Sequence, residues 1–207
     1  MNACKYTFTL LLASATFASA LQAAQPAMTR EQANAYLDAH QLSPLRGNLT
    51  SPLIGGRVEE VEALLAAGVD PNEKDELPQT TLELAAMSCS GGRVKPADTV
   101  AMMDALLAAG ARPNDPGMGG MTALISAAQK CPGVVLKRLI AGGAKLDART
   151  PQGYTALSMA LLLSNYDAAA VLIDAGARLS PTAARKLLDG HKADKRRVAL
   201  VKRAMKN

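Results

Sequence analysis

The residues of this 207-residue chain that could take part in chemistry are few and far apart. Its two histidines, His40 and His191, stand in no zinc-binding HExxH pattern. The chain also has no CxxC pair, no Gly-x-Ser-x-Gly turn and no GxxxxGKS or GxxxxGKT phosphate loop. The carboxylates Glu73, Asp75 and Glu76 are close in sequence, but they lie in a predicted turn and not in a cleft suited to acid–base catalysis. We therefore predict that the protein is not an enzyme and that it uses no metal and no cofactor.

A leucine-rich motif recurs along the chain and predicts the helices that position the polar residues between them. It reads LLAAGV, LLAAGA, LIAGGA and LIDAGA, and each copy has apolar residues at helical spacing before its glycine. A glycine can adopt the left-handed conformation that ends a helix, so each copy is predicted to be a helix with its C-cap. The intervals between these glycines, which are Gly68, Gly110, Gly143 and Gly176, are 42, 33 and 33.

A second motif keeps the same period. TTLELAA, TALISAA and TALSMAL begin at Thr80, Thr122 and Thr155, so they repeat at intervals of 42 and 33, the same as the first three glycines. Their alanines would allow one helix to lie close to its neighbours, and the segments between units are rich in turn-forming Pro, Gly, Asn and Asp. Two motifs that share one period predict a stack of helix–turn–helix units, and therefore an all-α solenoid.

The two motifs together resemble the ankyrin-repeat family, whose pattern is T-P-L-H-x-A-A followed by L-L-x-x-G-A-x-x-N. The three threonines match the first position of that pattern, and Asn72 and Asn114 match the asparagine at the tip, which Asp147 and Ser180 replace in later units. The resemblance is specific about the fold and nearly silent about the partner. The histidine of the family pattern is replaced in all three units, by Glu83, Ile125 and Ser158.

The resemblance implies an ankyrin-type solenoid of about four repeats between two sets of capping helices. The first unit is degenerate, with Gly47 at the threonine position. A helix in residues 24–46 would cap the repeat domain at residues 47–180, and residues 181–207 would form basic capping helices. The four units are expected at about 47–79, 80–121, 122–154 and 155–180.

One unit carries an insertion. The first of the three intervals exceeds the other two by nine residues, and the extra residues fall between the two helices of the second unit, near residues 89–97. Insertions in repeat proteins often lie on a binding face, but a surface loop also lengthens at little cost. The sequence leaves both interpretations open.

Cys89 and Cys131 occupy equivalent positions, each nine residues after the threonine of its unit. Helices that pack side by side are about 8–10 Å apart, whereas a disulfide requires Cα atoms within about 7 Å. Both cysteines are at predicted helix ends, however, and an oxidising compartment favours pairing. The sequence therefore leaves open whether the two are bridged.

Residues 1–23 are typical of a secretory signal. Lys5 precedes an apolar run at residues 8–17, and small residues allow cleavage after Ala20 or Ala23. The run is too short to span a bilayer. We therefore expect an exported protein located in the periplasm.

The C-terminal segment is strongly basic. Residues 181–207 carry nine Lys and Arg against two Asp, a net charge of +7, whereas the whole chain is +5. Two helices are predicted, at residues 181–190 and 192–206, and the second would place Val198, Leu200, Val201, Ala204 and Met205 on its apolar side. This segment is interpreted as a solvated cap, with weak contact to an anionic membrane or to an acidic partner as the alternatives.

Proteins of the ankyrin family bind other proteins through the repeat tips and the first helices, and the resemblance implies the same here. We expect a monomeric, non-catalytic scaffold, with Met118 and Tyr154 dominating the affinity. The candidate partner-binding residues are Glu73, Lys74, Glu76, Asp115, Met118, Arg149, Gln152 and Tyr154 at tips, Glu83, Met87, Ile125, Gln129, Ser158 and Leu162 on first helices, and Arg93 and Lys95 on the insertion.

Three functions fit such a scaffold. It could protect or assist a periplasmic enzyme, confer immunity against a delivered toxin, or act as an adaptor anchored to a membrane surface by residues 192–206. Nucleic acid is not expected as a partner. Export separates the chain from it, and aromatic residues, at 3% of the chain with no Trp, are too few to provide a platform for stacking bases.

Overall fold

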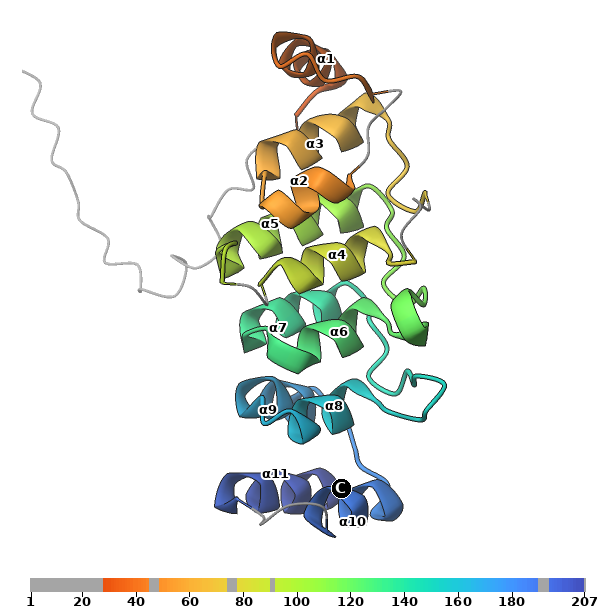
Figure 1. Ribbon diagram of the computed structural model, residues 1–207, viewed down its shortest axis with the longest axis vertical. Coiled ribbons are helices and arrows are strands. Elements are labelled where there is room, and N and C mark those ends of the chain that lie inside the picture. The colour runs from red at the N-terminus through yellow and green to blue at the C-terminus, as the bar shows by residue number, and fades with distance from the viewer. Residues whose placement is uncertain (1–27, 45–48, 74–77, 90–91, 190–193, 207) are drawn as a thin grey trace, which may run out of the picture.

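The computed structural model describes residues 28–44, 49–73, 78–89, 92–189 and 194–206. Within these ranges the chain is helical without strands, and its helices stack in pairs along one axis (Figure 1). The predicted all-α solenoid of about four repeats is confirmed. The proposed signal at residues 1–23 lies outside the described residues.

Four helix pairs form the body of the stack and correspond to the four expected units. The first helices of the pairs pack on one another in one row, and the second helices pack in a parallel row (Figure 1). The pairs are α2 (Thr50–Gly55) with α3 (Val58–Ala67), α4 (Thr81–Ser88) with α5 (Pro96–Ala108), α6 (Ala123–Lys130) with α7 (Gly133–Ala141), and α8 (Ala156–Leu162) with α9 (Tyr166–Asp174).

The two recurring motifs set the ends of these helices. Thr80 and Thr155 are N-caps whose hydroxyls accept hydrogen bonds from the backbone N–H groups of Glu83 and Ser158. At the other end, Gly68 follows α3 with φ 106°, a left-handed conformation that a side chain would strain. From the second unit on, each first helix therefore starts directly after its threonine, and in every unit a left-handed glycine follows the second helix within two residues. In the first unit α2 starts at Thr50 and not directly after Gly47.

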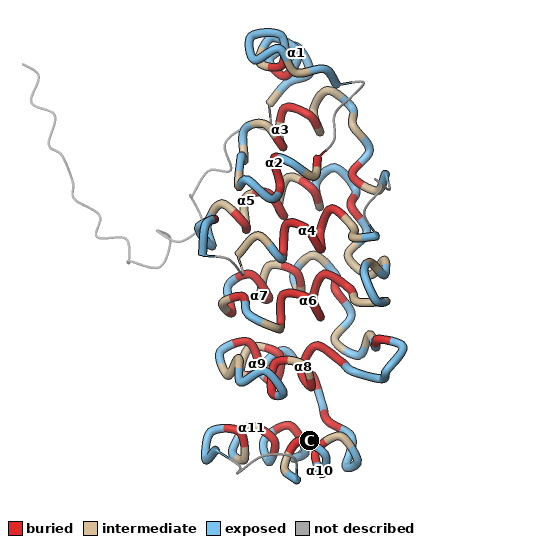
Figure 2. The backbone as a smooth tube through the Cα atoms, viewed as in Figure 1, coloured by how far each residue is buried: buried red, intermediate tan, exposed pale blue. Residues whose placement is uncertain are grey.

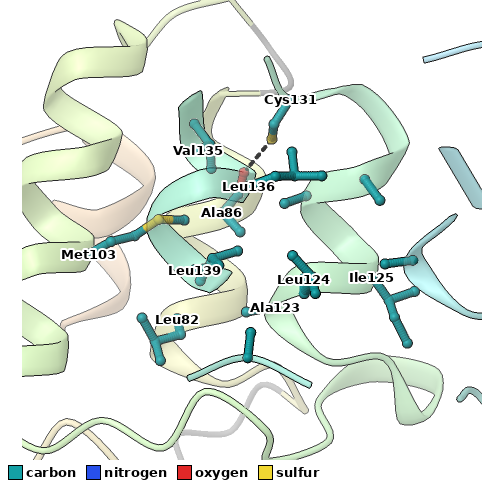
Figure 3. Close-up of a cluster of buried hydrophobic side chains, with 14 of the residues drawn as sticks. Leu82, Ala86, Met103, Ala123, Leu124, Ile125, Cys131, Val135, Leu136 and Leu139 are labelled. Carbon is teal, nitrogen blue, oxygen red and sulfur yellow. Dashed lines mark hydrogen bonds between the residues drawn. The ribbon is translucent and has the colours of Figure 1, made fainter. Parts of the chain in front are cut away.

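The core runs through the whole stack between the two rows of helices (Figure 2). Leu64, Leu106, Leu139 and Leu172 occupy the same place in successive units and are all buried. Alanines on the first helices, such as Ala127, are fully buried and let neighbouring helices approach closely. Figure 3 shows this packing around Leu139.

Additional helices close both ends. At one end α1 (Arg30–Ala39) packs on α3 and begins with a capping box between Thr29 and Gln32. At the other end α10 (Pro181–Asp189) packs beneath α8, and α11 (Lys195–Met205) packs beneath α9. No helix in the described part of the chain is both long enough and apolar enough to cross a membrane.

The buried side of α11 differs from the predicted apolar side. Val201 and Ala204 are fully buried as expected, but Met205, the last residue of α11, is exposed. Arg197 is buried instead and donates a hydrogen bond to the hydroxyl of Ser164 at 2.9 Å.

The insertion is divided between a loop and a helix. Only two residues separate α6 from α7, whereas residues 89–95 separate α4 from α5. The remaining extra residues lengthen α5, so Pro96 and Ala97 are helical and not part of the loop. Val94 anchors the loop against Gly56, where a Cβ would collide with the valine methyl groups.

A disulfide joins Cys89 to Cys131, with the Cα atoms 5.7 Å apart. The wider separation expected for packed helices does not apply to this pair, because both cysteines lie just beyond the ends of α4 and α6. Both Sγ atoms contact the carbonyl oxygen of Ala86, at 2.8 Å and 2.9 Å, and Figure 3 marks the second contact. Reduced thiols would donate hydrogen bonds to this same oxygen.

Candidate partner-binding surface

Side-chain amides hold successive tips in register. Asn72 donates a hydrogen bond to the carbonyl of Gly110 at 3.0 Å and accepts one from the N–H of Arg112 at 2.9 Å. Asn114 makes the same two bonds one unit further on, to Gly143 at 3.0 Å and from Lys145 at 2.8 Å. Each asparagine therefore fixes its own tip to the next.

The tip that carries Met118 is attached to the helices by a buried carboxylate. Glu83 is fully buried on α4 and accepts hydrogen bonds from the hydroxyl of Ser126 at 2.8 Å and from the N–H of Met118 at 3.0 Å. Burial raises the pKa of Glu83, and these hydrogen bonds act in the opposite direction. Gly117 makes the contact possible, because a Cβ at that position would overlap the carboxylate.

Two of the tip candidates present apolar surface. Met118 is 39% exposed and Tyr154 is 41% exposed, although the backbone of each is tied into its own tip. The N–H of Gly117 donates to the carbonyl of Met121 at 2.8 Å, and the N–H of Thr150 donates to that of Tyr154 at 2.9 Å. Both side chains are therefore displayed from closed turns.

The other tip candidates are polar and line the same edge of the stack. Glu73, Arg149 and Gln152 are exposed, whereas Asp115 is half-buried and forms an ion pair with Arg112 at 2.6 Å. Glu73, Arg112 and Asp115 border a shallow depression between the first two tips. The remaining two candidates, Lys74 and Glu76, lie outside the described residues.

A second exposed set lies on the first helices, seven residues after the threonine position of each unit. We call it the inner row, and its members are Ile54, Met87, Gln129 and Leu162. Ile54 is 56% exposed, Met87 38% and Leu162 37%, whereas Gln129 is half-buried and donates to the sulfur of Met121 at 3.4 Å. The row is therefore apolar with one polar member.

Three of the candidates on first helices are not available to a partner. Glu83, Ile125 and Ser158 lie three residues after the threonine position, and this position faces into the stack. Glu83 binds the next repeat as described above, Ile125 is packed in the core, and Ser158 forms a capping box with Thr155. The expectation that they line the binding surface is wrong.

The insertion does not extend the tip surface. Arg93 and Lys95 are exposed, but their loop lies at the end of α4 and α5 opposite the tips (Figure 1). The eight residues of α4 separate the two ends by about 12 Å. Met87 is the penultimate residue of α4 and so lies next to this loop, which means that the insertion borders the inner row and not the tips.

Sequence reasoning missed Ile54, although a signal for it was present. Counting seven residues from Gly47, the threonine position of the degenerate first unit, gives Ile54.

No group of three His, Cys, Asp or Glu side chains in the described ranges is placed to hold a metal ion.

A comparison with family models agrees with this geometry. Residues 93–183 match the model for ankyrin repeats (3 copies), a span that runs from the insertion loop to the start of α10. No curated protein matches the sequence. The matched segment therefore carries ankyrin repeats, which are generally non-catalytic modules that bind other proteins. The helices on its N-terminal side continue the same stack.

Proposed function

We propose that this protein is a monomeric, non-catalytic scaffold that binds one partner protein across the inner row and the tips. The observation that carries the proposal is the alignment of Ile54, Met87 and Leu162, three exposed apolar side chains at the same position of the first, second and fourth units. A folded monomer gains nothing from exposing such residues in a row, whereas a partner that covers them gains the free energy of their burial.

We further propose that the partner is an exported enzyme, which the scaffold protects or assists in the periplasm. The support for this location is the signal-like pattern of residues 1–23. A toxin delivered into the same compartment is the alternative partner. The identity of the captured protein separates the two: an enzyme of the cell itself supports the helper role, and a secreted toxin supports immunity.

The test uses affinity capture from periplasmic extract, followed by a binding titration with the protein identified. Met87→Glu combined with Leu162→Glu places two charges in the inner row, and we expect the affinity to fall at least about 30-fold, as for central residues of an interface. The matched control is Val134→Glu, because Val134 is 50% exposed on α7, in the other row of helices.

The control should bind as the wild type does. If the double variant also bound its partner with wild-type affinity, the inner row would not be the binding surface. Thermal unfolding of all three proteins verifies that the substitutions act on binding and not on folding.

A further inference from the structure

The last helix of the stack presents a continuous basic surface. Five cations, Lys195, Arg196, Lys202, Arg203 and Lys206, lie within about a third of the circumference of α11, on the side opposite Val201 and Ala204. Since Val201 and Ala204 pack toward α9, the cations point away from the repeats, and all five are exposed. We call this surface the basic end face.

The helix α11 itself contributes no negative charge beside these cations. The segment from Lys195 to Met205 contains no Asp or Glu, and the nearest acidic residue in sequence is Asp194, the N-cap of α11. Arg203 forms an ion pair with Asp174 of α9, which neutralises part of the charge. Asp194 likewise attracts Arg196. The five cations are distributed along a helix about 16 Å long, so the face keeps a net positive charge.

The structure also determines how such a face can bind. A basic amphipathic helix enters a membrane interface by burying its apolar side among lipid chains. Here that side is already covered, because Val201 and Ala204 are fully buried in the stack. Binding at this face must therefore be electrostatic and must stay at the surface.

An anionic lipid surface fits the basic end face better than a protein does. Protein interfaces are depleted of lysine at their centre and depend on buried apolar or aromatic anchors. Apart from Ala199, cations alone occupy the outer side of α11, and Met205 at its last turn is the single large apolar side chain exposed on the helix. Long flexible cations suit a fluid array of phosphate headgroups, where no fixed geometry is needed.

We propose that the basic end face binds the surface of bilayers that contain anionic phospholipid, by electrostatic attraction without insertion. The inference does not depend on the inner row. A solenoid held by its end face would stand away from the bilayer, with the tips and the inner row at its side and accessible to a partner.

The test is co-sedimentation of the full chain with two kinds of vesicle, one of phosphatidylcholine alone and one of two parts phosphatidylcholine to one part phosphatidylglycerol. We expect binding only to the anionic vesicles, and release in 1 M salt, where the Debye length falls to about 3 Å. Each cation near an anionic surface contributes about fivefold in affinity. Lys195→Gln, Arg196→Gln and Lys202→Gln together should therefore weaken binding about 100-fold.

The matched control removes the same net charge elsewhere, through Lys130→Gln, Lys137→Gln and Lys145→Gln, three exposed cations of the third unit. This control should retain vesicle binding. An equal loss in both triple variants would show that net charge and not the end face is responsible. Equal binding to neutral vesicles, or binding that survives 1 M salt, would overturn the electrostatic mode.

The salt and lipid comparisons are made on the wild-type chain, so they test whether binding to anionic vesicles is electrostatic even if a variant folds poorly. Binding to soluble polyglutamate without binding to anionic vesicles would assign the face to an acidic protein and refute the lipid proposal.

Discussion

Breaking the disulfide between Cys89 and Cys131 should lower the stability of the stack by a calculable amount. The two residues are 42 apart in sequence, so the bridge closes a loop of that length in the unfolded chain. The chain-entropy relation for such a loop gives about 4 kcal/mol at 25 °C. With a denaturant slope of about 4 kcal/mol per molar guanidinium chloride, the unfolding midpoint should move by about 1 M.

The assay compares guanidinium unfolding of three proteins by circular dichroism: oxidised wild type, reduced wild type, and Cys89→Ala/Cys131→Ala. We expect stability to decrease in that order. The reduced thiols can each donate to the carbonyl of Ala86, which the alanine variant cannot reproduce. The double variant should not respond to reductant, and it therefore controls for effects of the reductant on the rest of the chain.

Superimposable curves for oxidised and reduced wild type would refute the reasoning. Thiol labelling of the unreduced, unfolded protein provides an independent measurement. Cys89 and Cys131 should not react, and labelling of both would show that the bridge does not form.

Two further perturbations concern the tips. Because burial raises the pKa of Glu83 above its ordinary value of 4.5, the folded state holds this proton more tightly than the unfolded chain does. Its contribution is most favourable below pH 4.5 and declines as pH rises through the folded pKa. Glu83→Gln should remove this decline, measured as the unfolding free energy from pH 4 to pH 8, and an unchanged profile would exclude Glu83 as its source. Asn114→Ala removes both hydrogen bonds to the next tip and should lower the unfolding free energy by about 1–2 kcal/mol. A decrease of less than about 0.3 kcal/mol would mean that water replaces the amide at no cost in stability.

The fold could be predicted from the sequence alone because the same helix-start and helix-stop residues recur in several units. The threonines and glycines mark helix ends in unit after unit, and local capping chemistry suffices to explain why. The exception is Thr122, whose hydroxyl is buried and has no hydrogen-bond partner within the described residues. An error at one unit could not change the prediction, since its neighbours repeat it.

The candidate binding surface was harder to predict, because helical spacing indicates which face of a helix a residue occupies but not what packs against that face. The position seven residues after the threonine was correctly expected to be exposed at Met87 and Leu162. The position three residues after it was wrongly expected to be exposed, since neighbouring first helices cover it. Nothing near Glu83 in sequence indicates that its partners are Met118 and Ser126, which are 35 and 43 residues away.

The asymmetry between the middle and the ends of the stack restricts how such a chain can change its length. Every internal unit is covered on both sides by a similar unit, whereas the outer sides of α1 and α11 carry exposed charged residues such as Glu31 and Lys202. A duplicated unit would find a matching surface only between existing neighbours. Lineages of this protein should therefore gain and lose repeats from the interior and keep their two terminal helices.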